Sequence, residues 1–323
     1  MKKLIVVLGP TASGKSKLAV KLALRLSSGQ AKKNFKIEGA EIVSADSRQV
    51  YKGMDIGTGK ITKKEMMGVP HHLLDVASPK RRFTVVQYRQ LALAAIEKIQ
   101  EKNKIPILCG GTGFYIQAIV EGIVIPRVLP DWNLRKKLGK KSSEELYHML
   151  KKMDPRRAKT IEKKNPRRLI RAIEIVLKTR GPVPRLKQNP LPYPVLTLGI
   201  KKTPEELKKL IKKRLLIWLK EGLIKEVKKI KNSGLSWEEI EEFGIHYKVI
   251  SQYLQKKVDY KEMQRKSLKE LQNYAKRQLT WFKRDKRIYW VENYRDAPKK
   301  SLGDLTGQAE KLVKEFLKKN EGE

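Results

Sequence analysis

Runs of aliphatic residues alternate with segments of helical periodicity in the first third of the chain. Residues 2–8 (KKLIVVL) end in the continuous apolar run LIVVL, which is typical of a strand buried on both faces of a sheet. The runs at residues 40–45 and 105–109 predict two more strands, while residues 18–26 and 85–102 place apolar side chains at helical spacing. Strands that alternate with helices in this order predict an α/β fold with a parallel sheet.

The pattern changes at about residue 125. Residues 131–177 are polar, basic and helix-prone without a convincing strand, and a stretch rich in proline and glycine follows at residues 181–194. Residues 195–200 then resume the strand pattern, and a capped helix that begins at Pro204 comes next. This order predicts a helical insertion domain at residues 127–194.

The insertion would divide one α/β core into two parts of the sequence. Residues 1–126 supply most of the expected strands, and residues 195–323 supply a largely helical remainder with one late strand at residues 288–291. We therefore expect both parts to build one core, in which helices flank the parallel sheet.

Composition adds a strong positive charge to this picture. The 323 residues contain 73 Lys and Arg against 34 Asp and Glu, a formal net charge of +39, and 40% of them are hydrophobic. That apolar share is too high for a disordered polycation. Residues 127–200 are the densest segment, with 20 basic against 6 acidic side chains. The charge predicts a polyanionic partner or a phosphate-rich substrate, although lysines on helix faces are often plain solvated surface.

Two absences narrow the class of protein further. The sequence has no stretch of about 18 apolar residues, so we expect no membrane segment. The single cysteine, Cys109, excludes a disulfide framework and a cysteine-based metal centre, and it fits a reducing compartment. The sequence therefore predicts a soluble cytoplasmic protein in which Cys109 belongs to the core.

A phosphate-binding loop is predicted at residues 9–16 (GPTASGKS), which match G-x-x-x-x-G-K-[ST] between a strand and a helix. Glycines let successive backbone N–H groups converge on phosphate oxygens, and the start of the helix adds partial positive charge. Lys15 would neutralise the outer phosphate, and the Ser16 hydroxyl would bind Mg²⁺. ATP, GTP and other diphosphate-bearing molecules all fit such a loop. The expected phosphate-binding residues are Gly9, Pro10, Thr11, Ala12, Ser13, Gly14, Lys15 and Ser16.

A carboxylate follows the second predicted strand at Asp46. Ligands of open parallel sheets bind outside the carboxyl ends of the strands, so Asp46 should face the same crevice as the phosphate loop. Two functional roles are open, a general base acting on an acceptor or an outer ligand of Mg²⁺. The structural alternative is an aspartate that caps a helix or a turn.

Seven motifs follow one another along most of the chain. They are GPTASGKS (9–16), SADSRQVYKGMDIGTGK (44–60), VPHHLLD (69–75), IPILCGGTGFYIQA (105–118), RRLIRAIE (167–174), EGLIKEV (221–227) and YAKRQLTWFKRD (274–285). In this order they resemble the tRNA dimethylallyltransferases, also called tRNA isopentenyltransferases. The resemblance covers about residues 4–285, and the ordered set is far more specific than the phosphate loop alone.

The resemblance implies a P-loop NTPase-like core and the transfer of a dimethylallyl group from dimethylallyl diphosphate to N6 of the adenosine immediately 3′ of the anticodon, with release of diphosphate. It implies Mg²⁺ as cofactor, a monomer, and the tRNA anticodon stem-loop as partner. Asp46 would accept a proton or a hydrogen bond from the adenine amino group. Thr11 and Arg214 would contact the diphosphate, and Ser16 would bind the metal.

The resemblance also implies RNA contacts in both parts of the chain. Residues 167–171 would form a basic helix on which Arg168 and Arg171 share one face while Leu169 and Ile170 pack inward. Aromatic and cationic side chains alternate at residues 274–284, which suits base stacking and phosphate contact, although Trp281 and Phe282 suit a place in the core equally well. The implied tRNA-binding residues are Asp46, Ser47, Arg48, Gln49, Thr112, Arg135, Arg167, Arg168, Leu169, Ile170 and Arg171.

Several positions depart from the family pattern or carry a second interpretation. Residues 28–39 form a longer connection than usual, which predicts a surface loop. Asn165 stands where Asp is common, and His246 stands where Gly is usual; because Gly supplies backbone conformations that His adopts less readily, the local geometry there is an open question. His71 and His72 would point to opposite faces of an extended segment, which favours a structural role over a shared metal ion.

Three other functions fit parts of the sequence. An isopentenyltransferase of free adenine nucleotides would share Asp46 and the phosphate loop, but it would have no use for a densely basic insertion. A P-loop kinase would bind and turn over ATP. A non-enzymatic RNA-binding protein would not need the complete set of phosphate-loop residues together with Asp46 and Arg214.

Overall fold

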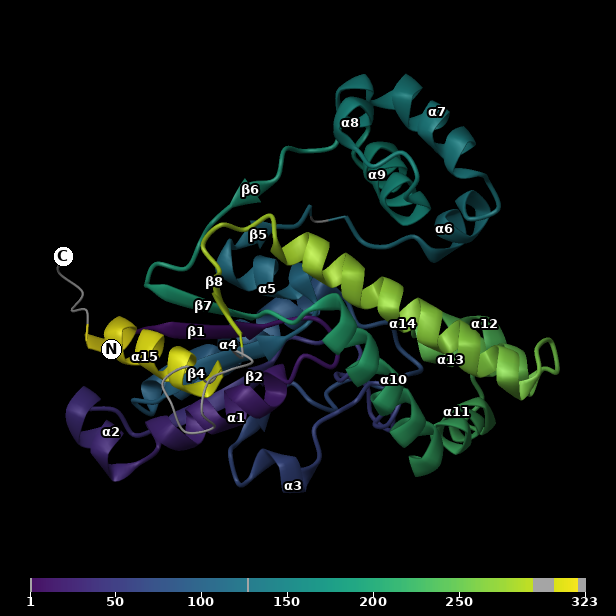
Figure 1. The fold of residues 1–323 in the computed structure, drawn as a ribbon. Helices are drawn as coiled ribbons and strands as arrows, with labels where there is room; N and C mark the ends of the chain where they lie inside the picture. The colour runs from purple at the N-terminus through teal and green to yellow at the C-terminus, as the bar shows by residue number, and fades with distance from the viewer. Residues whose placement is uncertain (1, 127, 293–304, 319–323) are drawn as a thin grey trace. The chain divides into compact units, whose positions relative to one another are not determined.

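The computed structural model describes residues 2–126, 128–292 and 305–318, which form two compact units (Figure 1). Residues 1–121 and 190–323 build the first, here called the sheet unit, and residues 122–189 build the second, here called the helical unit. The helical unit begins and ends five residues before the predicted limits of the insertion, because the short strands β5 (Ile123–Val124) and β6 (Lys187–Gln188) pair with each other within it.

A six-stranded parallel sheet with the order β3-β2-β4-β1-β7-β8 forms the centre of the sheet unit. Five of these strands confirm the predicted apolar runs. β3 was not predicted, because two adjacent histidines carry no strand pattern. The strands are β1 (Leu4–Leu8), β2 (Ala40–Ser44), β3 (His71–His72), β4 (Ile105–Gly110), β7 (Val195–Ile200) and β8 (Tyr289–Val291).

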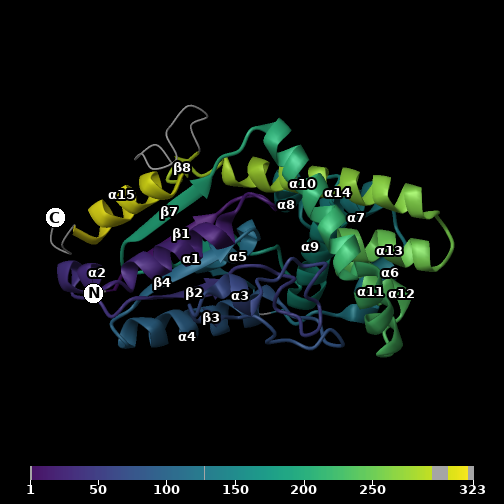
Figure 2. The ribbon, with the colours of Figure 1, turned by 60° about the horizontal axis from the view of Figure 1, so that its bottom comes forward.

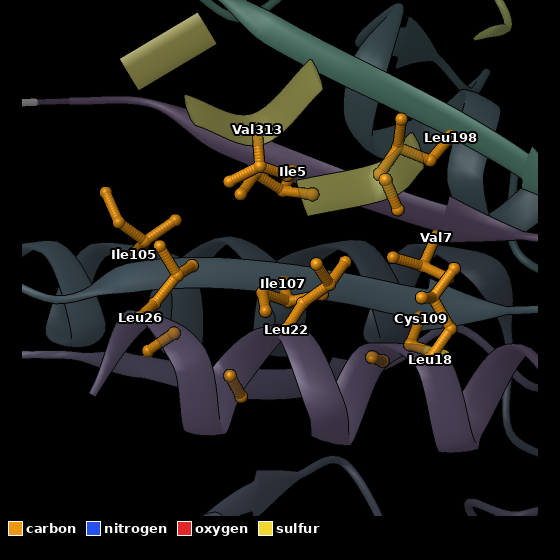
Figure 3. Close-up of a cluster of buried hydrophobic side chains, with 14 of the residues drawn as sticks. Ile5, Val7, Leu18, Leu22, Leu26, Ile105, Ile107, Cys109, Leu198 and Val313 are labelled. Carbon is orange, nitrogen blue, oxygen red and sulfur yellow. The ribbon is translucent and has the colours of Figure 1, made fainter. Parts of the chain in front are cut away.

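Helices cover both faces of the sheet and exclude water from it. α1 (Lys15–Leu26) and α15 (Leu305–Lys318) lie on one face, and α4 (Val85–Glu101) and α5 (Gly113–Val120) lie on the other. Figure 3 shows that Leu18, Leu22 and Leu26 of α1 point toward the side chains of β4. Each such buried leucine contributes about 1.5–3 kcal/mol relative to an exposed one.

The first strand and the last helix are joined by a buried ammonium group. Lys3, which is 1% exposed, donates hydrogen bonds to the carbonyls of Phe316 at 3.0 Å and Leu317 at 3.2 Å. These are carbonyl groups of the last turn of α15, which no helical N–H can satisfy, and a cation there also favours the helix dipole.

A second hydrophobic core lies beyond the carboxyl ends of the central strands (Figure 2). Five helices surround it, and Val50 and Tyr51, which follow β2, are buried in it. This core therefore brings the C-terminal helices against the loops that leave the sheet. The helices are α10 (Pro204–Glu221), α11 (Leu223–Asn232), α12 (Trp237–Glu242), α13 (Ile245–Leu254) and α14 (Tyr260–Phe282).

The helical unit has its own small core. Leu146, Leu150, Leu169 and Ile173 are 0% exposed and pack together at its centre. The unit contains 20 basic and 6 acidic side chains, so the basic insertion predicted from the sequence folds around an independent apolar centre. Its helices are α6 (Trp132–Leu138), α7 (Ser143–Met153), α8 (Pro155–Thr160) and α9 (Pro166–Thr179).

The prediction of a surface loop at residues 28–39 is wrong. Residues Gly29–Phe35 form the helix α2, which begins at a Ser28 cap whose side chain accepts the N–H of Ala31. Phe35 and Ile37 then turn into the core beside α1, so the extra length builds a helix and an anchor. A one-turn helix, α3 (Lys63–Met66), completes the sheet unit. No helix in the described part of the chain is long and apolar enough to cross a membrane.

Candidate active site

The phosphate loop connects β1 to α1 and leaves the start of that helix open. Gly14 has φ +91° and Ala12 has φ +63°, so the loop turns through left-handed backbone conformations. A Cβ on Gly9 would lie 2.7 Å from the Ser13 hydroxyl oxygen, so a larger residue there would require Ser13 to shift. No side chain caps α1, and its first turn carries no acidic residue. Its first N–H groups can therefore bind an anion.

Lys15 lies half-buried at this loop, where its Nζ donates to the carbonyl of Pro10 at 3.3 Å. Burial lowers the pKa of Lys15, the charge of Asp46 raises it, and the charge of Arg214 lowers it. Three residues far apart in the sequence therefore share one electrostatic environment at the end of the sheet, which the sequence analysis predicted for Lys15 and Asp46.

Asp46 follows β2 and stabilises a turn with one of its two carboxylate oxygens. Oδ1 accepts hydrogen bonds from the backbone N–H groups of Arg48 at 2.9 Å and Gln49 at 3.4 Å. Oδ2 accepts no hydrogen bond from the residues that the structure describes. The structural and the functional interpretations of Asp46 are thus compatible, because the turn leaves one oxygen for a ligand.

Thr112 holds the backbone on the other side of Asp46. Its Oγ1 accepts the N–H of Ser47 at 3.0 Å and donates to the Ser47 hydroxyl at 3.3 Å. The close approach of β2 and β4 allows this contact, since a Cβ on Gly110 would lie 2.1 Å from the carbonyl oxygen of Ala45. Thr112 and Ser47, both predicted RNA contacts, therefore also fix the turn that carries Asp46.

Arg214 reaches the same region from α10. Its guanidinium lies over the Trp218 ring, 4.8 Å from the centroid, and Nη2 donates to the carbonyl of Gly59 at 3.2 Å. Burial lowers the pKa of Arg214, while the charge of Asp46 raises it. The stacking and the hydrogen bond restrict the guanidinium and leave other N–H groups for an anion.

Gln49 and Arg48 complete the surroundings of Asp46. Gln49 Nε2 donates to the carbonyl of Gly59 at 3.1 Å, the same oxygen that Arg214 binds. Arg48 extends toward the start of α13, where a Cβ on Gly244 would lie 3.7 Å from Arg48 Nε. Burial and the charge of Asp46 raise the pKa of Tyr274, and Arg48 lowers it. Tyr274 of α14 therefore lies within electrostatic range of Asp46 and Arg48.

Sequence reasoning missed Gln278, a buried side chain on α14. Its Oε1 accepts the N–H of Thr11 at 2.8 Å, and its Nε2 donates to the carbonyl of Gly111 at 2.8 Å. Gln278 is 6% exposed and joins the phosphate loop to the turn after β4. A polar residue on the inward face of an amphipathic helix was the available signal, because a buried amide requires partners.

Two of the predicted RNA-binding arginines have a different partner within the helical unit. Glu174, which is 0% exposed, accepts hydrogen bonds from Arg135 Nε at 2.8 Å and from Arg171 Nη1. Arg171 Nη2 also donates to the carbonyl of Val128 at 3.0 Å. A buried carboxylate therefore holds the guanidinium of Arg171, whereas Arg168 pairs with an exposed one. The RNA contact of Arg171 stays a prediction.

The other two arginines of the predicted basic run lie at the start of α9. Arg167 and Arg168 are exposed, and Arg168 forms an exposed ion pair with Glu162 at 3.4 Å. Leu169 is fully buried and Ile170 packs at the edge of the core, as expected for inward-facing residues. The side chain of Leu169 therefore belongs to the core of the helical unit. Its RNA contact stays a prediction. Asn165 caps α9 by accepting the N–H of Arg168 at 3.3 Å.

The two adjacent histidines have structural partners, as predicted. His71 Nδ1 lies 2.8 Å from the carbonyl oxygen of Val69, and His72 Nε2 lies 2.7 Å from the buried carboxylate of Glu41. Cys109 is 7% exposed in the core, which confirms its predicted role, and burial raises its pKa to about 11. These groups support the sheet beneath the site.

His246 does not strain the backbone at the position where the family pattern has glycine. It is the second residue of α13 with helical dihedrals, and the unusual φ of +121° belongs to Gly244. The imidazole is 7% exposed, and its ring lies edge-on to Trp218 with 4.9 Å between centroids. Burial, together with the charge of Arg214, lowers the pKa of His246 to about 3. A neutral histidine therefore packs behind the tryptophan that supports Arg214.

Comparison with known proteins supports the resemblance over most of the chain. The profile described as IPP transferase matches residues 49–285. The chain belongs to this family. It is 38% identical over 299 residues to the tRNA dimethylallyltransferase of Acetivibrio thermocellus, with 90% of this chain and 92% of the relative covered. It is 40% identical over 300 residues to tRNA dimethylallyltransferase 1 of Syntrophus aciditrophicus, with 90% and 94% covered.

Solved structures of family members have the same fold. The tRNA isopentenylpyrophosphate transferase from Bacillus halodurans is 34% identical to this chain and superimposes with a TM-score of 0.70, covering 98% of both chains. A eukaryotic dimethylallyltransferase described as acting on tRNA is 25% identical, with a TM-score of 0.70, 90% of this chain and 74% of that chain covered. The predicted α/β core with a parallel sheet is confirmed by these members of the family.

The residues at the start of α1 fit a magnesium ion that is bound mainly by its ligand. No three carboxylate, histidine or cysteine side chains form a metal-binding group within the described ranges. Ser16 offers a hydroxyl beside the open phosphate loop, at the start of α1. Mg²⁺ commonly keeps several waters and takes other oxygens from the phosphates of its substrate, so one hydroxyl suffices.

Proposed function

We propose that this protein transfers a dimethylallyl group from dimethylallyl diphosphate to N6 of the adenosine immediately 3′ of the anticodon in tRNA, releasing diphosphate. The observation that carries the proposal is the common environment of Lys15, Asp46 and Arg214, in which one carboxylate acts electrostatically on two cations beside an uncapped helix start. An anionic leaving group and a neutral amine that must lose a proton need these two kinds of group side by side.

The diphosphate would bind the phosphate loop and the two cations. As the allylic C–O bond breaks, its electron pair moves to a diphosphate oxygen, and the new negative charge develops between Lys15, Arg214 and the N–H groups of α1. Thr11 would add its hydroxyl, since Gln278 already binds its backbone N–H. Ser16 would bind Mg²⁺, which adds positive charge to the same oxygens when it is present. No phosphoryl group moves in this reaction.

The acceptor base would lie against Asp46. N6 of adenine forms the new bond to the allylic carbon, and the proton that it loses passes to a carboxylate oxygen. Asp46 Oδ2 is available for this role, because the turn uses Oδ1. Gln49, Arg48 and Tyr274 would surround the base. Since a base in an anticodon loop is stacked, it must be turned outward to reach such a pocket.

The helical unit would bind the anticodon stem-loop by its charge. Its 20 basic against 6 acidic side chains suit a phosphate backbone, and Arg167 and Arg168 are its exposed candidates at the start of α9. Arg135 and Arg171 would instead keep α6 and α9 together through Glu174. An enzyme acting on free adenine nucleotides would gain nothing from this charge.

The decisive assay offers labelled dimethylallyl diphosphate, Mg²⁺ and either unmodified tRNA or AMP. We expect label in tRNA and none in AMP. Label in AMP alone would contradict the proposal and favour the nucleotide-modifying enzyme. ATP consumption without label in either acceptor would favour the kinase. A matched tRNA with guanosine in place of the target adenosine controls for transfer elsewhere on the molecule.

A further inference from the structure

A carboxylate on α11 holds the loop at residues 54–60 through its backbone. Glu226 Oε2 accepts hydrogen bonds from the N–H groups of Asp55 and Ile56, both at 2.7 Å. Oε1 accepts the N–H of Gly57 at 3.0 Å and the hydroxyl of Tyr247 at 2.8 Å. Hydrogen bonds to an ionised carboxylate are stronger than those between neutral groups, so these four donors fix the loop firmly.

The first half of the loop is tied directly to its second half. The N–H of Gly59 donates to the carbonyl of Ile56 at 2.9 Å, and the N–H of Lys60 donates to the carbonyl of Asp55 at 2.9 Å. Two of the residues that Glu226 binds, Asp55 and Ile56, therefore hold Lys60 and Gly59 in turn. If the loop backbone that the Glu226 carboxylate binds were displaced, the Gly59 carbonyl, one turn further along the loop, would move with it.

The Gly59 carbonyl is where this loop meets the proposed active site. Its oxygen accepts Arg214 Nη2 at 3.2 Å and Gln49 Nε2 at 3.1 Å. The fit is tight, since a Cβ on Gly59 would lie 2.1 Å from Arg214 Nη2. One oxygen thus orients a guanidinium assigned to the diphosphate and an amide assigned to the base pocket.

We infer that Glu226 is a positioning residue for the transfer reaction, acting through the Gly59 carbonyl on Arg214 and Gln49. The inference rests on the proposed function for the roles of those two residues. It adds a contribution from α11, which itself supplies no side chain to the site. Glu226 touches no substrate in this mechanism. Its removal should therefore affect the reaction only by displacing Arg214 and Gln49.

The test uses the full chain and inorganic diphosphate with Mg²⁺ as the probe of Arg214. In Glu226→Gln an amide nitrogen replaces one acceptor oxygen and faces backbone N–H groups. We expect the diphosphate Kd from calorimetry to rise about tenfold, while the tRNA Kd stays within threefold. Glu221→Gln removes the same charge from an exposed position at the end of α10 and should leave both constants unchanged.

A double-mutant cycle separates positioning from general damage to the fold. In an Arg214→Ala background, Glu226→Gln should raise the diphosphate Kd less than twofold, because the group through which Glu226 acts is gone. A tenfold increase in both backgrounds, or no increase in either, would overturn the inference. If Glu226→Gln does not fold, Glu226→Asp takes its place. The aspartate keeps the negative charge, but its side chain is too short to accept hydrogen bonds from all four donors. Failure to modify tRNA would instead count against the proposed function, because diphosphate binding is measured without transfer.

Discussion

Gln278 accepts a hydrogen bond from the backbone N–H of Thr11 at 2.8 Å, and so connects the long helix α14 to the phosphate loop. Gln278→Met keeps the length of the side chain and removes both hydrogen bonds. Because the loop would lose its support, we expect the KM for dimethylallyl diphosphate to rise about tenfold, the equivalent of about 1.4 kcal/mol. Gln272→Met on the same helix is the matched control. An unchanged donor KM would show that the loop holds its shape without Gln278.

Asp46→Asn separates the turn from the chemistry. Asparagine Oδ1 can still accept the N–H groups of Arg48 and Gln49, so the backbone should keep its conformation. The variant should lose at least about a hundredfold in kcat, because an amide cannot take up the proton from N6. The affinity for tRNA, measured by filter binding, should remain within threefold. Retained transfer by Asp46→Asn would restrict Asp46 to its structural role.

Glu174→Ala should destabilise the helical unit by about 3 kcal/mol, since it leaves two half-buried guanidinium groups without their carboxylate. Hydrogen exchange of the α6 and α9 amides would measure the loss. Unchanged hydrogen exchange in α9 would mean that water replaces the Glu174 carboxylate as the hydrogen-bond partner of Arg135 and Arg171. Burial raises the pKa of Glu174, but hydrogen bonds from Arg135, the Asp131 N–H and Arg171 outweigh it, so the pKa is lowered. The stabilisation should therefore persist at neutral pH and disappear as the pH falls below about 4.5, the ordinary glutamate value.

Replacement of Arg167 and Arg168 by alanine should weaken tRNA binding and reduce its dependence on salt. Each lost phosphate contact should lower the log–log slope by about 0.7–0.9. The ion pair of Arg168 with Glu162 is exposed and contributes little to stability, so the fold should tolerate the change. The control removes two exposed lysines of α7, Lys151 and Lys152. Equal slopes for both double variants would show that position on the unit does not matter.

His246 makes the fold sensitive to acid. The folded protein keeps this imidazole neutral down to a pKa of about 3, whereas the unfolded chain takes up a proton near 6.5. The unfolded state therefore binds more protons than the folded state between these two pH values. As the pH decreases through this window, the free energy of unfolding should fall by about 1.4 kcal/mol per pH unit. Urea titrations at pH 7 and pH 5 should show the loss in the wild type and a smaller one in His246→Leu. Parallel losses would assign the acid sensitivity to other groups.

The sequence predicted those parts of the fold that follow local rules. Strand runs such as residues 195–200 match β7 to the residue, and the phosphate loop and Asp46 could be assigned because their positions after strands determine where they lie. Long-range partners were not predictable. In the sequence, Glu174 is a single acidic residue in a predicted helix, and no neighbouring residue indicates that its carboxylate binds two arginines. Gln278 and Glu226 were not predicted for the same reason, since the backbone groups that they bind lie more than 160 residues away in the sequence.

The bond between Lys3 and the last turn of α15 has a consequence for biosynthesis. Lys3 precedes the first strand of the sheet, and the carbonyls that it binds lie more than 310 residues later in the chain. Until α15 is synthesised, one face of the central sheet, with Ile5 and Leu22, has an incomplete cover. Nascent chains therefore carry an exposed apolar surface until α15 has been made, and chains that stop before α15 should be preferred clients of chaperones and proteases.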